Sequence, residues 1–258
     1  MLKLVNVTKI FNPSSANEKV AVQNLDFTLE DGDFVTVIGG NGSGKTTTLN
    51  LIAGTLEASS GHIILDDKDI TNVSDYKRAK YIARVFQDPM MGTASDMNLL
   101  ENIELASKRG SKHSPFRWGF KKNKREAYIE DLKKLDLGLE DRLTQKVGLM
   151  SGGQRQAIAL LMATINRPKI LLLDEHTAAL DPKTAKKVLQ LTDKLVRENH
   201  LTTMMITHNM KDAITYGDRL VMFHMGRIIF DVRGEEKQKL TVEDLLKKFD
   251  EADKQMEE

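Results

Sequence analysis

A glycine-rich loop between a predicted strand and a predicted helix constrains this chain more than any other feature. Its residues are Gly39, Gly40, Asn41, Gly42, Ser43, Gly44, Lys45 and Thr46, which complete the pattern G-x-x-x-x-G-K-[ST]. The apolar run 34–38 comes directly before the loop, and a predicted helix begins with Thr47 directly after it. The order of strand, loop and helix is the context that a phosphate-binding loop requires.

The residue types of this loop match the chemistry of a bound triphosphate. Glycines let the backbone wrap a phosphate without Cβ clashes, so that N–H groups point inward, and a helix N-terminus adds a positive dipole end. Lys45 is expected to reach the β- and γ-phosphates, and the Thr46 hydroxyl to ligate Mg²⁺. A chance match would occur in about one in a hundred chains of this length, given an average glycine content. We therefore predict a nucleotide-binding protein.

Composition narrows the class further. A chain of 258 residues with 40% apolar residues can form one large domain, and we predict a single domain over 1–258. The net charge is +1, from 38 basic and 37 acidic residues, so nothing indicates a nucleic-acid partner. The chain has no cysteine, which excludes disulfides and thiolate metal sites. Neither a secretion signal nor an apolar run of about 18 residues is visible, so any membrane role is expected to act through partners.

Hydrophobic periodicity predicts an α/β fold with a parallel core, an antiparallel N-terminal sheet and a helical insertion. The insertion is expected over about 88–165 and a C-terminal helix over about 241–257. The helix after Thr46 is expected to place Leu49, Ile52, Ala53 and Leu56 on one face. Strands are predicted at 2–10, 20–29, 34–38, 62–65, 81–86, 169–173, 203–207 and 219–223, the last forming a hairpin with 227–230.

One basic stretch, 108–125, lies inside the predicted helical insertion. We favour a solvated loop and helix start for it, with a protein or membrane contact as the alternative. The sequence does not assign it a role.

Two adjacent carboxylates, Asp174 and Glu175, follow the apolar run 170–173. A carboxylate at such a strand end holds Mg²⁺ in phosphate-loop ATPases, which is the role expected of Asp174. Glu175 is then free to polarise a water in line with the γ-phosphate. Alone this pattern is weak, but beside a phosphate loop it is strong.

A second glycine motif decides the family. Ser151, Gly152, Gly153 and Gln154 open a predicted helix 23 residues before Asp174. A serine hydroxyl and a flexible Gly–Gly backbone at a helix N-terminus repeat the anion-binding device of the first loop. The segment resembles the signature of the ATP-binding cassette (ABC) family, whose fold has a RecA-like parallel core.

Other positions fall where this family has functional residues. Gln87 resembles the Q-loop glutamine, which contacts Mg²⁺ and the membrane subunits, and the segment that ends in Asp181 resembles the D-loop. His208 is similar to the switch histidine at the γ-phosphate, and Phe11 to the aromatic ring that stacks on adenine. The resemblance implies catalysis by Glu175, His208 and Gln87, and Mg²⁺ ligation by Thr46, Gln87 and Asp174. It implies ATP contacts from Phe11, Gly39, Asn41, Gly42, Ser43, Gly44, Lys45, Thr46, Thr47, Ser151, Gly152, Gly153, Gln154 and Asp181.

Two positions depart from the usual family pattern. Met150 replaces the more common leucine, a change that nearly conserves volume. His176 stands where proline is usual, and we interpret it as a subfamily trait because no second metal ligand lies three or four residues away. The surrounding segments 86–89 and 174–182 are most similar to bacterial importer ATPases of tryptophan or tyrosine transport systems.

The resemblance also implies partners. Two copies would pair head to tail on ATP, so that Ser151 of one copy caps the nucleotide on Lys45 of the other. Transmembrane permease subunits and an extracytoplasmic substrate-binding protein would complete the complex at the cytoplasmic face of the membrane, with no nucleic acid. Methionines adapt to a foreign surface at low cost, so Met90, Met91 and Met97 are candidates for permease docking, with core packing as the alternative.

Several alternatives stay open from sequence alone. An exporter or a lipoprotein-extracting ATPase would share all these motifs, because direction is set by the membrane subunits. A soluble ABC ATPase acting on ribosomes or DNA is less favoured, since the chain has one cassette and no sustained heptads. A small-molecule kinase is disfavoured, because the second glycine motif would have no function in one. The cargo, the direction and the permease partners are not determined by the sequence.

Overall fold

A computed structural model describes residues 1–110 and 122–257. It contains two compact units, the first formed by Met1–Arg78 with His200–Glu258 and the second by Ala79–Asn199. Each unit is described by itself below. In the described part of the chain, no helix is both long and apolar enough to cross a membrane.

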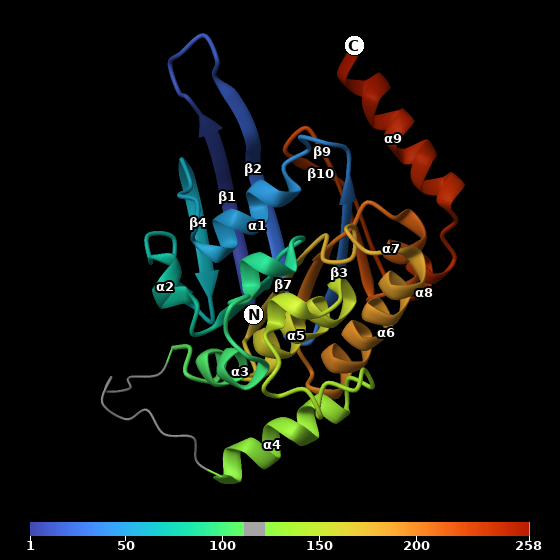
Figure 1. The fold of residues 1–258 in the computed structure, drawn as a ribbon. Coiled ribbons are helices and arrows are strands. Elements are labelled where there is room, and N and C mark those ends of the chain that lie inside the picture. The colour runs from blue at the N-terminus through green and yellow to red at the C-terminus, as the bar shows by residue number, and fades with distance from the viewer. Residues whose placement is uncertain (111–121, 258) are drawn as a thin grey trace. The chain divides into compact units, whose positions relative to one another are not determined.

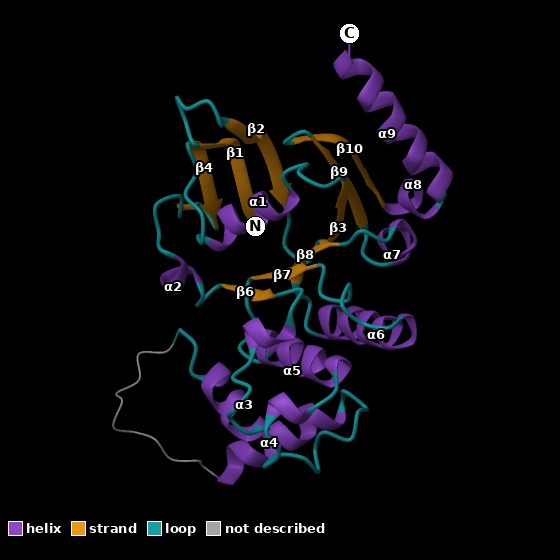
Figure 2. Ribbon diagram, turned by 45° about the horizontal axis from the view of Figure 1, so that its top comes forward, coloured by secondary structure: helices purple, strands orange, loops and turns teal. Residues whose placement is uncertain are grey.

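The first unit begins with an antiparallel sheet in the order β2-β1-β4-β5. Its strands are β1 (Leu2–Phe11), β2 (Lys19–Leu29), β4 (Ser60–Leu65) and β5 (Lys68–Asp69), and β1, β2 and β4 lie side by side in Figure 2. Leu2, Leu4 and Val7 of β1 are buried, while Val5 between them is exposed, as expected for strands with one covered face. The predicted antiparallel N-terminal sheet is confirmed.

A second sheet of the first unit carries the phosphate loop. Its strands are β3 (Phe34–Gly39), β8 (Thr202–Ile206), β9 (Arg219–His224) and β10 (Arg227–Arg233), with β3 parallel to both β8 and β9. β3, β8 and β9 are buried almost throughout, which explains why their sequences are continuous apolar runs. The predicted hairpin exists as the antiparallel pair β9–β10.

The helices of the first unit are α1 (Lys45–Ala53), α2 (Asp75–Arg78), α7 (Met210–Thr215), α8 (Gly234–Gln238) and α9 (Val242–Glu257), visible in Figure 1. α1 ends earlier than expected, because Gly54 adopts φ 82° as a left-handed C-cap. Leu56 therefore lies outside the helix, and its predicted place on the helix face is wrong. On α9, Leu245 is buried, whereas the neighbouring Leu246 is 48% exposed.

The second unit pairs two parallel strands with helices. β6 (Ile82–Val85) and β7 (Ile170–Asp174) are joined in register, and the described residues between them contain no other strand. The helices are α3 (Leu99–Ser107), α4 (Lys122–Lys133), α5 (Gly152–Thr164) and α6 (Pro182–Glu198), with short 3₁₀ turns at η1 (Pro89–Gly92) and η2 (Val147–Leu149). A parallel strand pair with helical connections is what the alternating pattern predicted.

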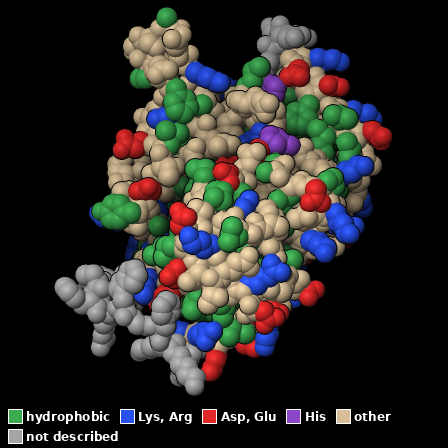
Figure 3. Space-filling model, in the orientation of Figure 1, with side chains coloured by type: hydrophobic (Ala, Val, Ile, Leu, Met, Phe, Trp, Pro, Cys, Tyr) green, Lys and Arg blue, Asp and Glu red, His purple; other side chains and the backbone are tan. Residues whose placement is uncertain are grey.

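The basic stretch 108–125 lies largely outside the described residues, which omit 111–121. Within the described part, the Lys108 ammonium pairs with Glu104 at 3.1 Å. On the face drawn in Figure 3, acidic and basic side chains are interspersed, in keeping with the near-zero net charge.

Candidate nucleotide-binding site

The phosphate loop of the first unit ends at the N-terminus of α1. The N-cap residue is Gly44, with φ 101°, and no side chain caps the helix. Lys45 is only 5% exposed, and its Nζ donates to the carbonyl oxygens of Gly39 at 2.7 Å and Gly40 at 2.9 Å. The loop therefore closes around the ammonium group, while the first N–H groups of α1 are not engaged by a capping side chain. This is the arrangement of an anion site.

Glycine is required at two positions of the loop, because the backbone of a neighbouring strand lies too close there for a Cβ atom. A Cβ added at Gly39 would lie 2.4 Å from the carbonyl oxygen of Phe223, and one at Gly44 would lie 2.6 Å from that of Ala21. Any larger residue would push the loop away from β2 and β9. Close packing against these two strands therefore fixes the path of the loop, and its main-chain N–H groups suit a phosphate chain.

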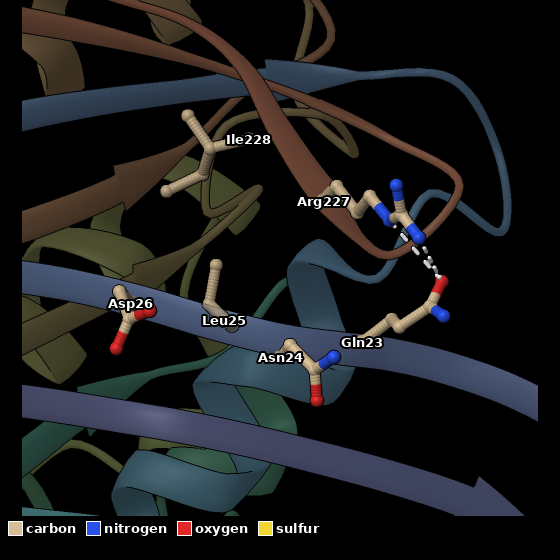
Figure 4. Close-up of a pocket in the computed structure, with 6 residues that line it drawn as sticks. All are labelled: Gln23, Asn24, Leu25, Asp26, Arg227 and Ile228. Carbon is tan, nitrogen blue, oxygen red and sulfur yellow. Dashed lines mark hydrogen bonds between the residues drawn. The ribbon is translucent and has the colours of Figure 1, made fainter.

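The turn of the β9–β10 hairpin is hydrogen-bonded to the phosphate loop. The Gly226 N–H donates to the Ser43 carbonyl oxygen at 2.9 Å, and the Gln23 N–H of β2 donates to the Gly226 carbonyl oxygen at 3.0 Å. Figure 4 shows Arg227 of the same hairpin bonded to the Gln23 side chain, at 2.9 and 3.1 Å. These contacts couple the loop to two strands, a support that the sequence pattern did not reveal.

A hollow of about 430 Å³ lies beside this support, between β2 and β10 (Figure 4). It is lined by Gln23, Asn24, Leu25, Asp26, Arg227 and Ile228. Its polar groups already have partners: Arg227 bonds Gln23, and Asp26 accepts the Asn6 N–H at 2.9 Å. We assign it no role in nucleotide binding.

The remaining predicted residues of the first unit lie on the phosphate loop or at the ends of strands and helices. Thr46 is exposed at the start of α1, followed by the half-buried Thr47, and Asn41 and Gly42 are exposed on the loop. His208 is exposed just after β8, before the Asn209 side chain that caps α7. Phe11 ends β1 with the Lys9 ammonium 5.3 Å from its ring centroid. Thr46, His208 and Phe11 thus each lie at or beside the end of a regular element.

In the second unit, Asp174 ends the buried strand β7 and is 9% exposed. Its carboxylate accepts from Nη2 of Arg84, on the neighbouring strand β6, at 2.6 Å. The Arg84 guanidinium also lies 4.6 Å from the ring centroid of Phe86. Sequence analysis missed Arg84, because its role follows from the β6–β7 register and no motif marks it.

Glu175 turns the chain away from β7 in an uncommon conformation. Its φ is 47°, in the left-handed region that a residue with a Cβ seldom adopts, and its side chain is half-buried. The next residue, His176, is fully enclosed at 2% exposure, and burial lowers its pKa to about 4, so the ring is neutral at pH 7.

Gln87 is exposed two residues after the end of β6. The preceding carbonyl, that of Phe86, accepts from Nε2 of Gln156 on α5 at 3.1 Å, and the following residue Asp88 caps η1. Both neighbours of Gln87 are therefore fixed, while its own side chain lies at the surface.

The signature segment of the second unit opens α5 through a capping box. The Ser151 hydroxyl accepts from the Gln154 N–H at 3.3 Å, and the Gln154 side chain accepts from the Ser151 N–H at 3.2 Å. Gly153 has no positive φ but a close neighbour: an added Cβ would lie 2.2 Å from Cγ2 of Thr184 on α6. The expected flexible Gly–Gly backbone is thus a packing requirement at Gly153.

Asp181 begins α6, where its carboxylate accepts the Thr184 N–H at 3.1 Å. Its pKa is lowered, mainly by the hydrogen bond from the Thr184 side chain. Because Thr184 also contacts the Gly153 position, Asp181 and the signature segment depend on the same residue.

The residues present fit a Mg²⁺ ion that is bound mainly through phosphate oxygens and water better than one that is enclosed by protein ligands alone. Within the described residues, no group of three or more His, Cys, Asp or Glu side chains could hold a metal. Mg²⁺ at nucleotide sites keeps waters and phosphate oxygens and needs only one or two protein oxygens. The exposed Thr46 hydroxyl and the Asp174 carboxylate are ligands of this kind.

The family follows from this fold and these motifs together with comparisons to known proteins. The sequence profile of the ABC transporter family matches residues 22–178, more than half of the chain. The chain belongs to this family.

Solved structures agree. The ATP-binding cassette MJ0796, in a dimeric post-hydrolysis state with ADP and Pi, is 31% identical with a TM-score of 0.76, covering 90% of this chain and 98% of its own. The ATP-binding cassette MJ1267 in its ADP conformation is 29% identical with a TM-score of 0.78, and 95% of each chain is covered. The predicted α/β cassette fold is confirmed.

Among curated relatives, the tyrosine transport ATP-binding protein of Clostridioides difficile is 47% identical over 251 residues, spanning 97% of this chain and 99% of the relative. The spermidine/putrescine import ATP-binding protein PotA of Haemophilus ducreyi is 35% identical over 90% of this chain, which spans only 57% of PotA. The chain is thus an ATP-hydrolysing, Mg²⁺-dependent subunit of an ABC transporter, a class whose ATPase domains dimerise and act with membrane permeases.

Proposed function

We propose that this chain is the ATPase subunit of a bacterial importer that carries tyrosine or a similar amino acid. The observation that carries the proposal is the 47% identity to a tyrosine transport ATP-binding protein, which extends over nearly the full length of both chains. The import direction is supported by the relatives named as import proteins. In this proposal two copies dock on permease subunits at the cytoplasmic face of the membrane, and an extracytoplasmic protein supplies the cargo.

The phosphate loop binds the nucleotide in this proposal. The loop N–H groups and the N-terminus of α1 hold the phosphates, and Lys45 offsets their charge. Thr46, Asp174 and Gln87 would hold Mg²⁺, which would help to neutralise the charge of the bound phosphates. Phe11 stacks on the adenine. The structural support is the glycine cradle, which admits no Cβ at Gly39 or Gly44.

Hydrolysis is assigned to the residues at two strand ends. Glu175 accepts a proton from the attacking water, and His208 offsets charge that develops on the γ-phosphate. Ser151 and its neighbours act on the nucleotide of the second copy, so that two equivalent sites form in the dimer. The exposed positions of Ser151, Gln87 and His208 support these roles, because each side chain lies at the surface.

Permease docking is assigned to the segment that follows Gln87. Met90 and Met91 are 40% and 69% exposed, whereas Leu99 and Ile103 are fully buried and belong to the core. A hollow of about 270 Å³ lies in the same unit, lined by Arg84, Gly92, Leu105, Ala106, Arg109, Ala159, Met162 and Ala163. Exposed methionines, one of them next in sequence to Gly92 of this hollow, suit the packing of a partner's side chains.

The catalytic assignment is tested by Glu175→Gln, with Glu198→Gln as a control on the exposed end of α6. The amide keeps the shape of the carboxylate but cannot accept the proton. We expect Glu175→Gln to lose at least a hundredfold in ATP turnover and to elute as a dimer with Mg-ATP in size-exclusion chromatography. Glu198→Gln should hydrolyse ATP normally. Wild-type turnover in Glu175→Gln would remove Glu175 from the role of base.

The cargo is tested in proteoliposomes that contain this subunit, the permease encoded beside it and the matching binding protein. Tyrosine, added with the binding protein, should stimulate ATP hydrolysis and accumulate on the side of the ATPase. Stimulation by spermidine and not by tyrosine would replace the amino-acid assignment with a polyamine one. Movement of cargo in the opposite direction would overturn import.

A further inference from the structure

His176 and Thr192 form a buried polar pair directly behind Glu175. Their side-chain atoms Nε2 and Oγ1 are 3.0 Å apart, and the two residues are 2% and 0% exposed. The Thr192 hydroxyl donates its proton to the Val188 carbonyl oxygen at 2.8 Å. It must therefore accept from His176, which fixes the neutral imidazole as the tautomer with hydrogen on Nε2.

The pair joins the end of β7 to the interior of α6. Val188 and Thr192 both belong to α6, one helical turn apart, whereas His176 is only two residues beyond the last residue of β7. Two further contacts hold the segment between β7 and α6. The Ala178 N–H donates to the Glu175 carbonyl oxygen at 2.9 Å, and Asp181 caps the N-terminus of α6. The turn that carries Glu175 is thus anchored to one helix at two places.

Glu175 needs such an anchor because of its backbone. Its φ of 47° is unfavourable for a residue with a Cβ, so the conformation persists only where the surrounding structure determines it. Asp174 before it is held on β7 by Arg84, and His176 after it supplies the fixed point on the α6 side of the turn. An apolar side chain at 176 would fill the same space but would leave its orientation unspecified, whereas a hydrogen bond in a dry interior is directional.

We propose that His176 is a positioning residue for ATP hydrolysis: its Nε2–H bond to Thr192 holds the Glu175 turn so that the carboxylate faces the attacking water. This inference rests on the proposed role of Glu175 as base. His176 itself touches neither nucleotide nor metal. It acts on the rate of hydrolysis through the backbone of its neighbour, and ATP affinity, which depends on the phosphate loop, should not respond to it.

The test compares Thr192→Val, which removes the acceptor at nearly constant shape, with Thr192→Ser, which keeps the hydroxyl. Leu189→Ala is the matched control, since Leu189 is a buried residue of the same helix, 3% exposed, with no polar contact to the turn. We expect Thr192→Val to lower kcat at least tenfold while KM for ATP stays within twofold. Thr192→Ser should stay within threefold of wild type, and Leu189→Ala should lower the melting temperature with kcat within twofold.

A second pair of variants keeps the proposal testable if Thr192→Val does not fold. His176→Gln retains an N–H donor at a similar reach, whereas His176→Phe fills the space without one, so His176→Gln should have the higher kcat. Wild-type kcat in folded Thr192→Val, or equal loss in Leu189→Ala, would overturn the positioning role. Glu175→Gln, assayed in parallel, distinguishes failure of the two proposals. ATP hydrolysis by Glu175→Gln would refute the role of Glu175 as base, independently of the result for the His176 and Thr192 variants.

Discussion

Packing between the signature segment and α6 allows a sharp test at Gly153. In Gly153→Ala, the new Cβ would lie 2.2 Å from Cγ2 of Thr184, a distance at which one of the two must move. Gly153 is buried and Thr184 is half-buried, and they lie at the first turns of α5 and α6 in the second unit. We therefore expect overpacking and not backbone strain, since Gly153 has no positive φ.

The magnitude follows from two opposing effects. Overpacking typically costs about 1–3 kcal/mol. Replacement of glycine by alanine within a helix stabilises the folded state by up to about 1 kcal/mol, because alanine has the higher helix propensity. With the full helix gain subtracted, the net destabilisation of Gly153→Ala should be about 0–2 kcal/mol. Thr184→Ser removes the colliding methyl and keeps the hydroxyl that bonds Asp181, so the double variant should recover most of this loss.

A double-mutant cycle measures the effect. Urea unfolding of wild type, both single variants and the double variant gives the coupling free energy, expected to be about 1–3 kcal/mol in favour of the double variant. ATP-induced dimerisation of the Glu175→Gln background, followed by size-exclusion chromatography, should fail in Gly153→Ala and return in the double variant. A coupling near zero would refute the collision, and dimerisation lost in both variants would show that Gly153 contacts the partner's nucleotide directly.

Further variants separate binding, dimerisation and docking. Lys45→Ala should weaken ATP binding to the monomer at least tenfold in fluorescence titration with a labelled nucleotide, because the ammonium held in the loop at 2.7 Å from Gly39 O is lost. Ser151→Arg should bind ATP normally in the same titration and fail to dimerise; equal loss of binding in both variants would contradict the head-to-tail site. Met91→Glu, at a position 69% exposed, should abolish co-purification with the permease while ATP binding is unchanged. Met90→Glu and Met97→Glu test the other two candidate methionines, and retention of the complex in all three variants would place docking elsewhere.

Much of the fold could be predicted because its signals are local. Buried parallel strands such as β3 and β8 are continuous apolar runs, and the β9–β10 hairpin is marked by the short turn at Gly226. The end of α1 was predicted wrongly. α1 stops at Gly54, a left-handed cap at which an added Cβ would lie 2.8 Å from the buried Arg78 side chain. The apolar periodicity continued past Gly54 to Leu56, although a glycine there is itself a local signal for a helix end.

The sequence by itself determined the chemistry: the phosphate loop, the paired carboxylates and the signature motif are contiguous patterns whose residue types are dictated by the ligand. Tertiary structure decided which residues support them. Arg84 reaches Asp174 only because β6 and β7 pair in one register, and Thr192 reaches His176 only because α6 packs against the end of β7. Gly153 is likewise explained by Thr184, 31 residues away (184 − 153). Contacts of this kind depend on distances between elements, which no local pattern encodes, whereas a motif is fixed by the group it binds.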